Sequence, residues 1–86
     1  MPRAISMRHT IVPAGDRDEF RDRARRSVAH YSAVGCQYWL FVEASLPGAY
    51  VEFFEADSAE KLQRAHRDAP NPILESARMY VEVDLG

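Results

Sequence analysis

The chain has 86 residues, 47% of them hydrophobic and 28% charged, and a formal net charge of −2. A chain of this length builds one modest core, so we predict a single domain that spans residues 1–86. The composition is that of a globular protein. The negative charge argues against a nucleic-acid partner, because proteins that follow a phosphate backbone usually carry a basic excess.

Cysteine content and hydropathy predict a cytoplasmic protein with no membrane partner. Cys36 is the only cysteine, so the chain has no internal disulfide of the kind that supports small secreted domains. No segment has the roughly 18 consecutive apolar residues of a membrane span. The first residues contain no apolar run of signal-peptide length.

A strand is the first predicted element, over residues 4–12. Its side chains alternate between two faces, as a strand requires. One face carries Ile5, Met7, His9 and Ile11, and the other carries Ser6, Arg8 and Thr10. The segment Pro13-Ala14-Gly15 ends the strand.

A helix is predicted from residue 16 to about residue 32. Asp16 and Glu19 have the spacing of a capping box. The apolar stripe of the helix consists of Phe20, Ala24, Val28 and Tyr31, which are three or four residues apart. Gly35 then supplies the left-handed residue that commonly follows a helix.

Two strands over residues 36–45 and 50–56 are predicted to form an antiparallel hairpin. Both are rich in aromatic and β-branched residues, and Pro47-Gly48 suits the centre of the turn between them. The expected register pairs Ser45 with Tyr50, Glu43 with Glu52 and Phe41 with Phe54 on one face, and Val42 with Phe53 on the other.

A second helix is predicted after Asp57 and Glu60, which repeat the capping spacing. Its inner face consists of Leu62, Ala65, His66 and Ala69, and it ends near Pro70-Asn71-Pro72. A further helical turn is predicted over residues 73–77. Residues 78–85 alternate again and predict a fourth strand.

The predicted order is strand, helix, strand, strand, helix, strand. Right-handed crossovers place both helices on one face of a four-stranded antiparallel sheet, which is the ferredoxin-like βαββαβ arrangement of the α+β class. The helices are expected to cover Leu40, Val42, Val51, Phe53, Met79, Val81 and Val83. The uncovered face is expected to carry Trp39, Phe41, Tyr50, Phe54 and Tyr80.

An aromatic patch of this size exceeds what a monomer usually exposes, so we predict a homodimer in which a second copy covers it. The shared interior would also receive the polar side chains Ser6, Arg8, Thr10, Glu43, Glu52 and Glu82. Apolar walls with a few polar groups are typical of a small-molecule site. The expected contacts to a hydrophobic or aromatic ligand are Trp39, Phe41, Tyr50, Phe54, Tyr80 and Glu43.

The chain resembles the dimeric α+β barrel superfamily, and within it the antibiotic-biosynthesis-monooxygenase-type domain. The resemblance rests on Pro13-Ala14-Gly15 with Phe20, Gly35-Cys36 followed by Tyr38, Glu55, and Ala65-His66-Arg67-Asp68-Ala69-Pro70. It implies a homodimer with pockets between sheet and helices. It also implies, for some members, the oxidation of aromatic polyketides or quinol-like substrates by oxygen without a bound cofactor.

His66 and Arg8 are the candidate catalytic residues. His66 on the inner face of the second helix has the chemistry of a general base, and the alternative is a half-buried, hydrogen-bonded structural histidine. Arg8 would orient an anionic or phenolic substrate or form an interior salt bridge with Glu43, Glu52 or Glu82. We expect no metal and no cofactor, because the three histidines lie on separate elements and Cys36 has no companion thiol.

Two functional hypotheses follow. The first is a cofactor-independent monooxygenase-like enzyme with His66 as base and Arg8, Trp39 and Tyr80 positioning a flat aromatic substrate. The second is a non-catalytic protein of the same fold that binds a small ligand or only dimerises. Asp57 stands where the family often has Trp, which favours the second hypothesis.

Overall fold

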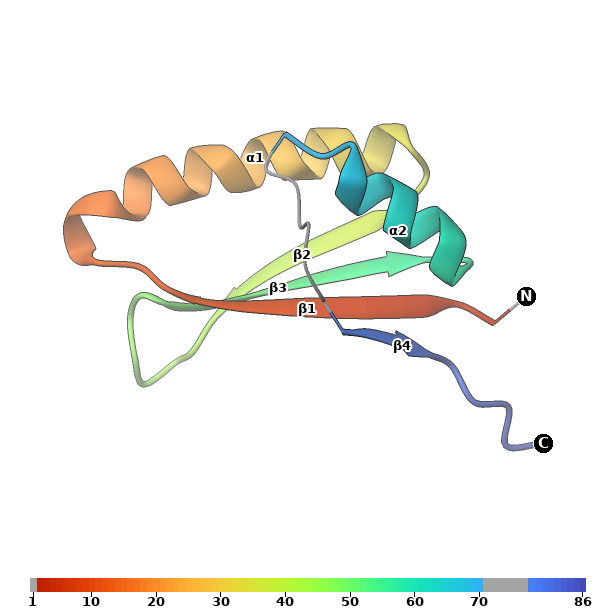
Figure 1. Cartoon of the computed structure of the whole chain (residues 1–86). Helices are drawn as coiled ribbons and strands as arrows, with labels where there is room; N and C mark the ends of the chain where they lie inside the picture. Colours follow the sequence, from red (N-terminus) through yellow and green to blue (C-terminus); the bar gives the residue numbers. More distant parts are fainter. Residues whose placement is uncertain (1, 71–77) are drawn as a thin grey trace.

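The computed structural model describes residues 2–70 and 78–86 and shows a four-stranded sheet with two helices on one face (Figure 1). The elements are β1 (Ala4–Ile11), the 3-10 turn η1 (Ala14–Asp16), α1 (Arg17–Ala33), β2 (Gln37–Val42), β3 (Ala49–Ala56), α2 (Ala59–Arg67) and β4 (Met79–Val81). The antiparallel strand order is β2-β3-β1-β4. The predicted ferredoxin-like α+β fold is confirmed. Neither helix in the described ranges is long and apolar enough to cross a membrane.

The helices begin differently from the predicted capping boxes. Asp16 precedes α1, but its side chain makes no capping hydrogen bond. Ser58, and not Asp57, is the N-cap of α2, where its hydroxyl accepts a hydrogen bond from the Lys61 backbone N–H at 3.2 Å. Asp57 instead lies 3.6 Å from the Lys61 ammonium group. The predicted helical turn over residues 73–77 lies outside the described residues.

The inner face of α1 includes one residue that the predicted stripe misses. Phe20, Ala24 and Tyr31 are buried as predicted, but Val28 is 50% exposed and Ser27 is buried in its place. Positions 20, 24, 27 and 31 follow the helical repeat of 3.6 residues more closely than a stripe through position 28 does. A serine hydroxyl therefore faces the sheet from the middle of α1.

The β2–β3 register is three residues away from the predicted one. Phe41 lies opposite Val51 and not opposite Phe54. The physical reason is the connection: residues 43–48 form a loop of six residues, whereas the prediction assumed a tight turn next to Ser45. Gly48, with a φ of 96°, does adopt the positive value predicted for this turn. An odd shift moves every β3 side chain to the other face relative to β2.

This shift reverses the predicted faces of β3 and β1. Tyr50, Glu52 and Phe54 lie under the helices and are at most 5% exposed. Arg8 pairs with Glu52 in the sheet register, so the polar side of β1 also faces the helices, contrary to the prediction. The other side, called the open face below, consists of Ile5, Met7, His9, Ile11, Gln37, Trp39, Phe41, Val51, Phe53, Glu55 and Tyr80.

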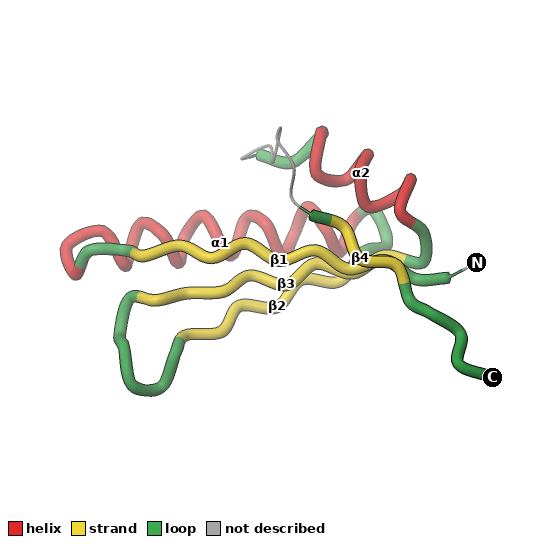
Figure 2. The backbone as a smooth tube through the Cα atoms, turned by 60° about the horizontal axis from the view of Figure 1, so that its bottom comes forward, coloured by secondary structure: helices red, strands yellow, loops and turns green. Residues whose placement is uncertain are grey.

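The last strand is shorter than predicted. β4 ends at Val81, and the predicted continuation to residue 85 is wrong. Figure 2 shows the chain leaving the sheet after β4. Val83 and Leu85 are 73% and 94% exposed, so the strand-like alternation in this segment finds no neighbouring strand within the described chain.

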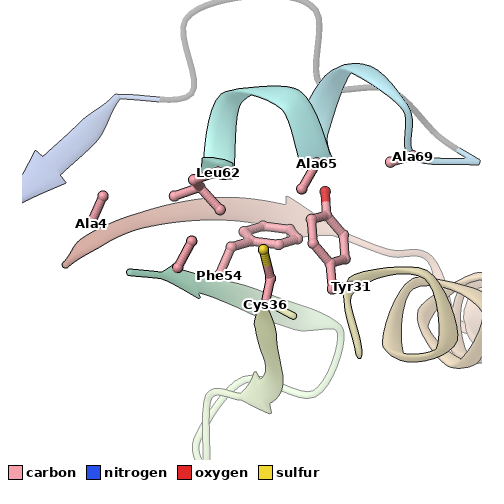
Figure 3. Packing of buried hydrophobic residues seen from close by; sticks show 8 residues of the cluster. Ala4, Tyr31, Cys36, Phe54, Leu62, Ala65 and Ala69 are labelled. Atoms are coloured by element: carbon pink, nitrogen blue, oxygen red, sulfur yellow. The ribbon is translucent and has the colours of Figure 1, made fainter. Parts of the chain in front are cut away.

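Two apolar clusters lie under the helices at opposite ends of the sheet. The first consists of Ala4, Tyr31, Cys36, Phe54, Ala56, Leu62, Ala65 and Ala69. In Figure 3, Tyr31 and Phe54 lie between α2 and the sheet, and the Tyr31 hydroxyl points toward α2. The second consists of Val12, Phe20 and Tyr50 under the beginning of α1. The strand positions between the two clusters are occupied by the opposed pair Arg8 and Glu52.

Candidate functional site

A polar band crosses the layer between the helices and the sheet. It consists of Ser6, Arg8, Tyr31, Tyr38, Glu52 and His66, all of them buried or partly buried. The strand register places Arg8 opposite Glu52. His66, on α2, forms a hydrogen bond with Ser6 on β1. Every buried side-chain N or O atom in the described ranges has a hydrogen-bond partner. The buried polar groups of the band therefore have their hydrogen-bond partners within the protein. The band lies between the two apolar clusters.

Glu52 is the most enclosed charge in this band. It is 2% exposed, and its two oxygens accept hydrogen bonds from Arg8 Nε–H at 2.8 Å and from the Tyr38 hydroxyl at 2.6 Å. Arg8 is more open, with 36% of its side chain exposed. A buried carboxylate needs such partners, because an unpaired charge in an apolar layer is costly.

The pKa shifts follow from this arrangement. Burial raises the pKa of Tyr38 far above its ordinary value, and the hydrogen bond to Glu52 raises it further, so Tyr38 is a neutral donor at neutral pH. Burial would lower the pKa of Arg8. The hydrogen bond and the charge of Glu52 outweigh it, and the pKa of Arg8 is raised.

His66 is enclosed at the other end of the band. It is 3% exposed, with Nε2 2.7 Å from the Ser6 hydroxyl and Nδ1 2.7 Å from the Tyr31 hydroxyl. Burial, together with the nearby charge of Arg8, lowers the pKa of His66 to about 4. The ring is therefore neutral at physiological pH, and both of its nitrogens are occupied by internal partners.

A cavity of about 180 Å³ opens between α1 and the sheet beside the polar band. The sheet contributes Arg8, Thr10 and Glu52, and α1 contributes Phe20, Arg23, Ala24 and Ser27. We call this space the α1 cavity. It combines an apolar wall, two hydroxyls and charged groups, which is the usual composition of a small-molecule site. His66 does not line it.

The structure divides the predicted site residues among three places. Arg8 and His66 lie under the helices, as do Tyr50 and Phe54. Trp39, Phe41 and Tyr80 lie on the open face and are 41%, 53% and 45% exposed. Glu43 lies beyond the end of β2 and is exposed. Trp39 and Tyr80 therefore cannot share one pocket with Arg8 and His66 in a single chain.

Arg23, Ser27, Tyr31 and Tyr38 were not predicted as site residues. The apolar stripe predicted for the first helix includes neither Arg23 nor Ser27, and only a strict 3.6-residue repeat starting at Phe20 would have indicated Ser27. His30 links α1 to α2. It is partly buried, and its Nε2–H donates to the Ala65 carbonyl at 2.8 Å.

Among residues 2–70 and 78–86, no three His, Cys, Asp or Glu side chains are grouped in a way that could hold a metal ion. No family model, no curated protein and no solved structure matches this chain.

Proposed function

We propose that this protein binds a small aromatic molecule in the α1 cavity, as a homodimer of the dimeric α+β barrel type. The observation that carries the proposal is the Arg8–Glu52 pair, which is held in the middle of the core and lines that cavity. A buried ion pair is a weak source of stability, and apolar side chains of similar volume would often serve the fold as well. Its position beside an empty space supports a binding role.

The dimensions of the cavity limit the ligand to about one ring. The cavity volume is about 180 Å³, and an apolar protein cavity of about 150 Å³ is enough to hold benzene. Phe20 and Ala24 supply the apolar wall, and Thr10 and Ser27 supply hydroxyl groups that can donate or accept. A single aromatic ring with one polar substituent fits this description.

The position of His66 favours binding over catalysis by this residue. A general base must lie within hydrogen-bond reach of the substrate proton, but His66 does not line the α1 cavity and both of its nitrogens have internal partners. The lowered pKa makes it a weak base. Cofactor-independent oxidation by oxygen, implied by the family resemblance, stays a prediction to be tested in parallel.

Filling the α1 cavity is expected to weaken ligand binding strongly. Binding of single-ring aromatics is measured by NMR chemical-shift changes in wild type and in Ala24→Leu, which places extra methyl groups in the cavity wall. We expect at least about a tenfold loss of affinity in Ala24→Leu, because the ligand and the new side chain compete for the same volume.

Ala29→Leu is the matched control, because Ala29 lies on the exposed side of the same helix. Its affinity should equal that of wild type. Equal loss of affinity in both variants, or chemical-shift changes confined to the open face, would place the ligand elsewhere.

The enzyme hypothesis has its own test, in which oxygen consumption with quinols is recorded for wild type and His66→Gln. Turnover that depends on His66 would restore the enzyme hypothesis.

The homodimer is supported by the open face. Ile5, Ile11, Trp39, Phe41 and Tyr80 are between 36% and 73% exposed there, and Figure 1 shows both helices on the opposite side. Among the described residues that form the open face, only Glu55 is acidic, and it is paired with Arg3 at the edge of the face. An apolar centre without charged groups is typical of an interface core. A second copy presents the same surface and covers it by two-fold symmetry.

Sedimentation equilibrium at micromolar concentration is expected to give twice the chain mass of 9.8 kDa. Phe41→Glu should shift the protein to monomers, because it places a charge in the interface core. Val28 lies on α1, away from the open face, and is 50% exposed, so the Val28→Glu variant should remain a dimer. Trp39, the only tryptophan, should show red-shifted emission in Phe41→Glu. A monomeric wild type would overturn the dimer proposal.

A further inference from the structure

The charges around the α1 cavity do not cancel. Glu52 is matched by Arg8 in a 2.8 Å ion pair. Arg23 also lines the cavity, and within residues 2–70 and 78–86 it forms no ion pair. The nearby Tyr31, Tyr38 and His66 are neutral at pH 7, because burial shifts the pKa of each toward its uncharged form. Among the described residues that line the cavity, the two arginines therefore exceed the one carboxylate by one positive charge.

Hydrogen-bond donors are also in excess there. Within the described residues, Arg8 uses only its Nε–H, and its terminal guanidinium N–H groups have no protein partner. A guanidinium carries five N–H donors in a planar fork, so four remain available. Both oxygens of Glu52 already accept a hydrogen bond. A ligand that supplies acceptors would complement this wall, whereas a further donor would compete for Glu52.

The apolar part of the cavity lies next to these donors. Phe20 and Ala24 line it from α1, and the Arg23 guanidinium lies 5.7 Å from the centroid of the Phe20 ring. The cation–π contact keeps Arg23 close to the cavity wall. A ring packed against Phe20 and Ala24 would therefore place a substituent near both arginines.

We infer that the ligand of the α1 cavity is a small aromatic carboxylate, with its ring against Phe20 and Ala24 and its carboxylate between Arg8 and Arg23. A carboxylate matches the planar fork of a guanidinium by two parallel hydrogen bonds and neutralises the excess charge. This inference rests on the proposed small-molecule site and adds the charge and the polar group of its ligand.

Benzoate and benzamide test the inference, because they have nearly the same shape and differ in charge. Calorimetry or NMR titration of the wild-type protein is expected to show benzoate binding about tenfold or more tightly than benzamide, since hydrogen bonds to a charged group are stronger than neutral ones. Raising the salt concentration should weaken benzoate binding only.

Arg23→Gln separates the charge from the cavity shape. We expect it to remove most of the preference for benzoate, because benzoate should lose far more affinity than benzamide, whereas Arg26→Gln, on the exposed side of α1, should behave as wild type. Equal affinity for both probes in wild type would overturn the carboxylate inference and leave the aromatic site standing. Failure of both probes and of the wider aromatic panel would overturn the proposed site itself.

Discussion

Arg8→Met is expected to lower the free energy of unfolding by about 3 kcal/mol, the lower end of the cost of breaking a buried pair. Glu52 is 2% exposed, so removal of Arg8 leaves a carboxylate that water cannot reach and that keeps only the Tyr38 hydroxyl as partner. The lower end applies because 36% of the Arg8 side chain is exposed, so water screens part of its charge. Urea unfolding at pH 7 and one fixed protein concentration measures the effect.

Glu52→Gln should lower the free energy of unfolding by less, about 1 kcal/mol. The arginine left behind can turn toward water, and the new amide still accepts a hydrogen bond from the Tyr38 hydroxyl. The double variant Arg8→Met/Glu52→Gln should be more stable than Arg8→Met alone, since no buried charge remains. Arg25→Met, which breaks an exposed pair with Asp22, is the control and should change stability by less than about 0.5 kcal/mol. A loss below 1 kcal/mol in Arg8→Met would show that water reaches Glu52 in the folded protein.

The arrangement of elements was predictable because each one carries its own periodicity. The alternation over residues 4–12, the aromatic and β-branched runs over residues 36–45 and 50–56, and the stripe through Phe20, Ala24 and Tyr31 are local signals. The order of strands and helices then leaves few topologies, because crossovers are right-handed. The fold follows from these two steps without knowledge of any single contact.

The faces of the sheet were not predictable to the same degree. Both faces of β2 and β3 carry large apolar side chains, so hydropathy does not select a register. The register is decided by the six-residue β2–β3 loop, residues 43–48, whose length no single turn signal reveals. Once that loop is known, Glu52 falls under α1 opposite Arg8, and the predicted pairing of Glu43 with Glu52 disappears.

The site could be predicted only in part for the same reason. Arg8 and His66 were singled out by residue type, and one of the three predicted partners of Arg8, Glu52, is the observed one. The α1 residues Arg23 and Ser27 were missed, because their role depends on which strand face lies beneath the helix. Trp39 and Tyr80 were placed with Arg8 because the predicted register put them on one face.

Acidification from pH 6.5 to pH 4 is expected to remove about 3 kcal/mol of stability through His66 alone. Its folded-state pKa of about 4 lies below the ordinary histidine pKa of 6.5, so the unfolded chain binds a proton in this range and the folded chain does not. Stability is therefore fully present above pH 6.5 and is lost as the pH falls. Urea unfolding at several pH values and constant protein concentration measures the slope of the unfolding free energy against pH.

His66→Gln should flatten the slope, because an amide does not titrate but can still donate and accept in place of the imidazole. The variant will be less stable than wild type at pH 7, and the two stability curves should converge toward pH 4. His9→Gln is the control: His9 is exposed on the open face, and its removal should leave the slope as in wild type. Parallel curves for wild type and His66→Gln would mean that another group takes up the proton, and that the imidazole between Ser6 and Tyr31 is reached by water before the chain unfolds.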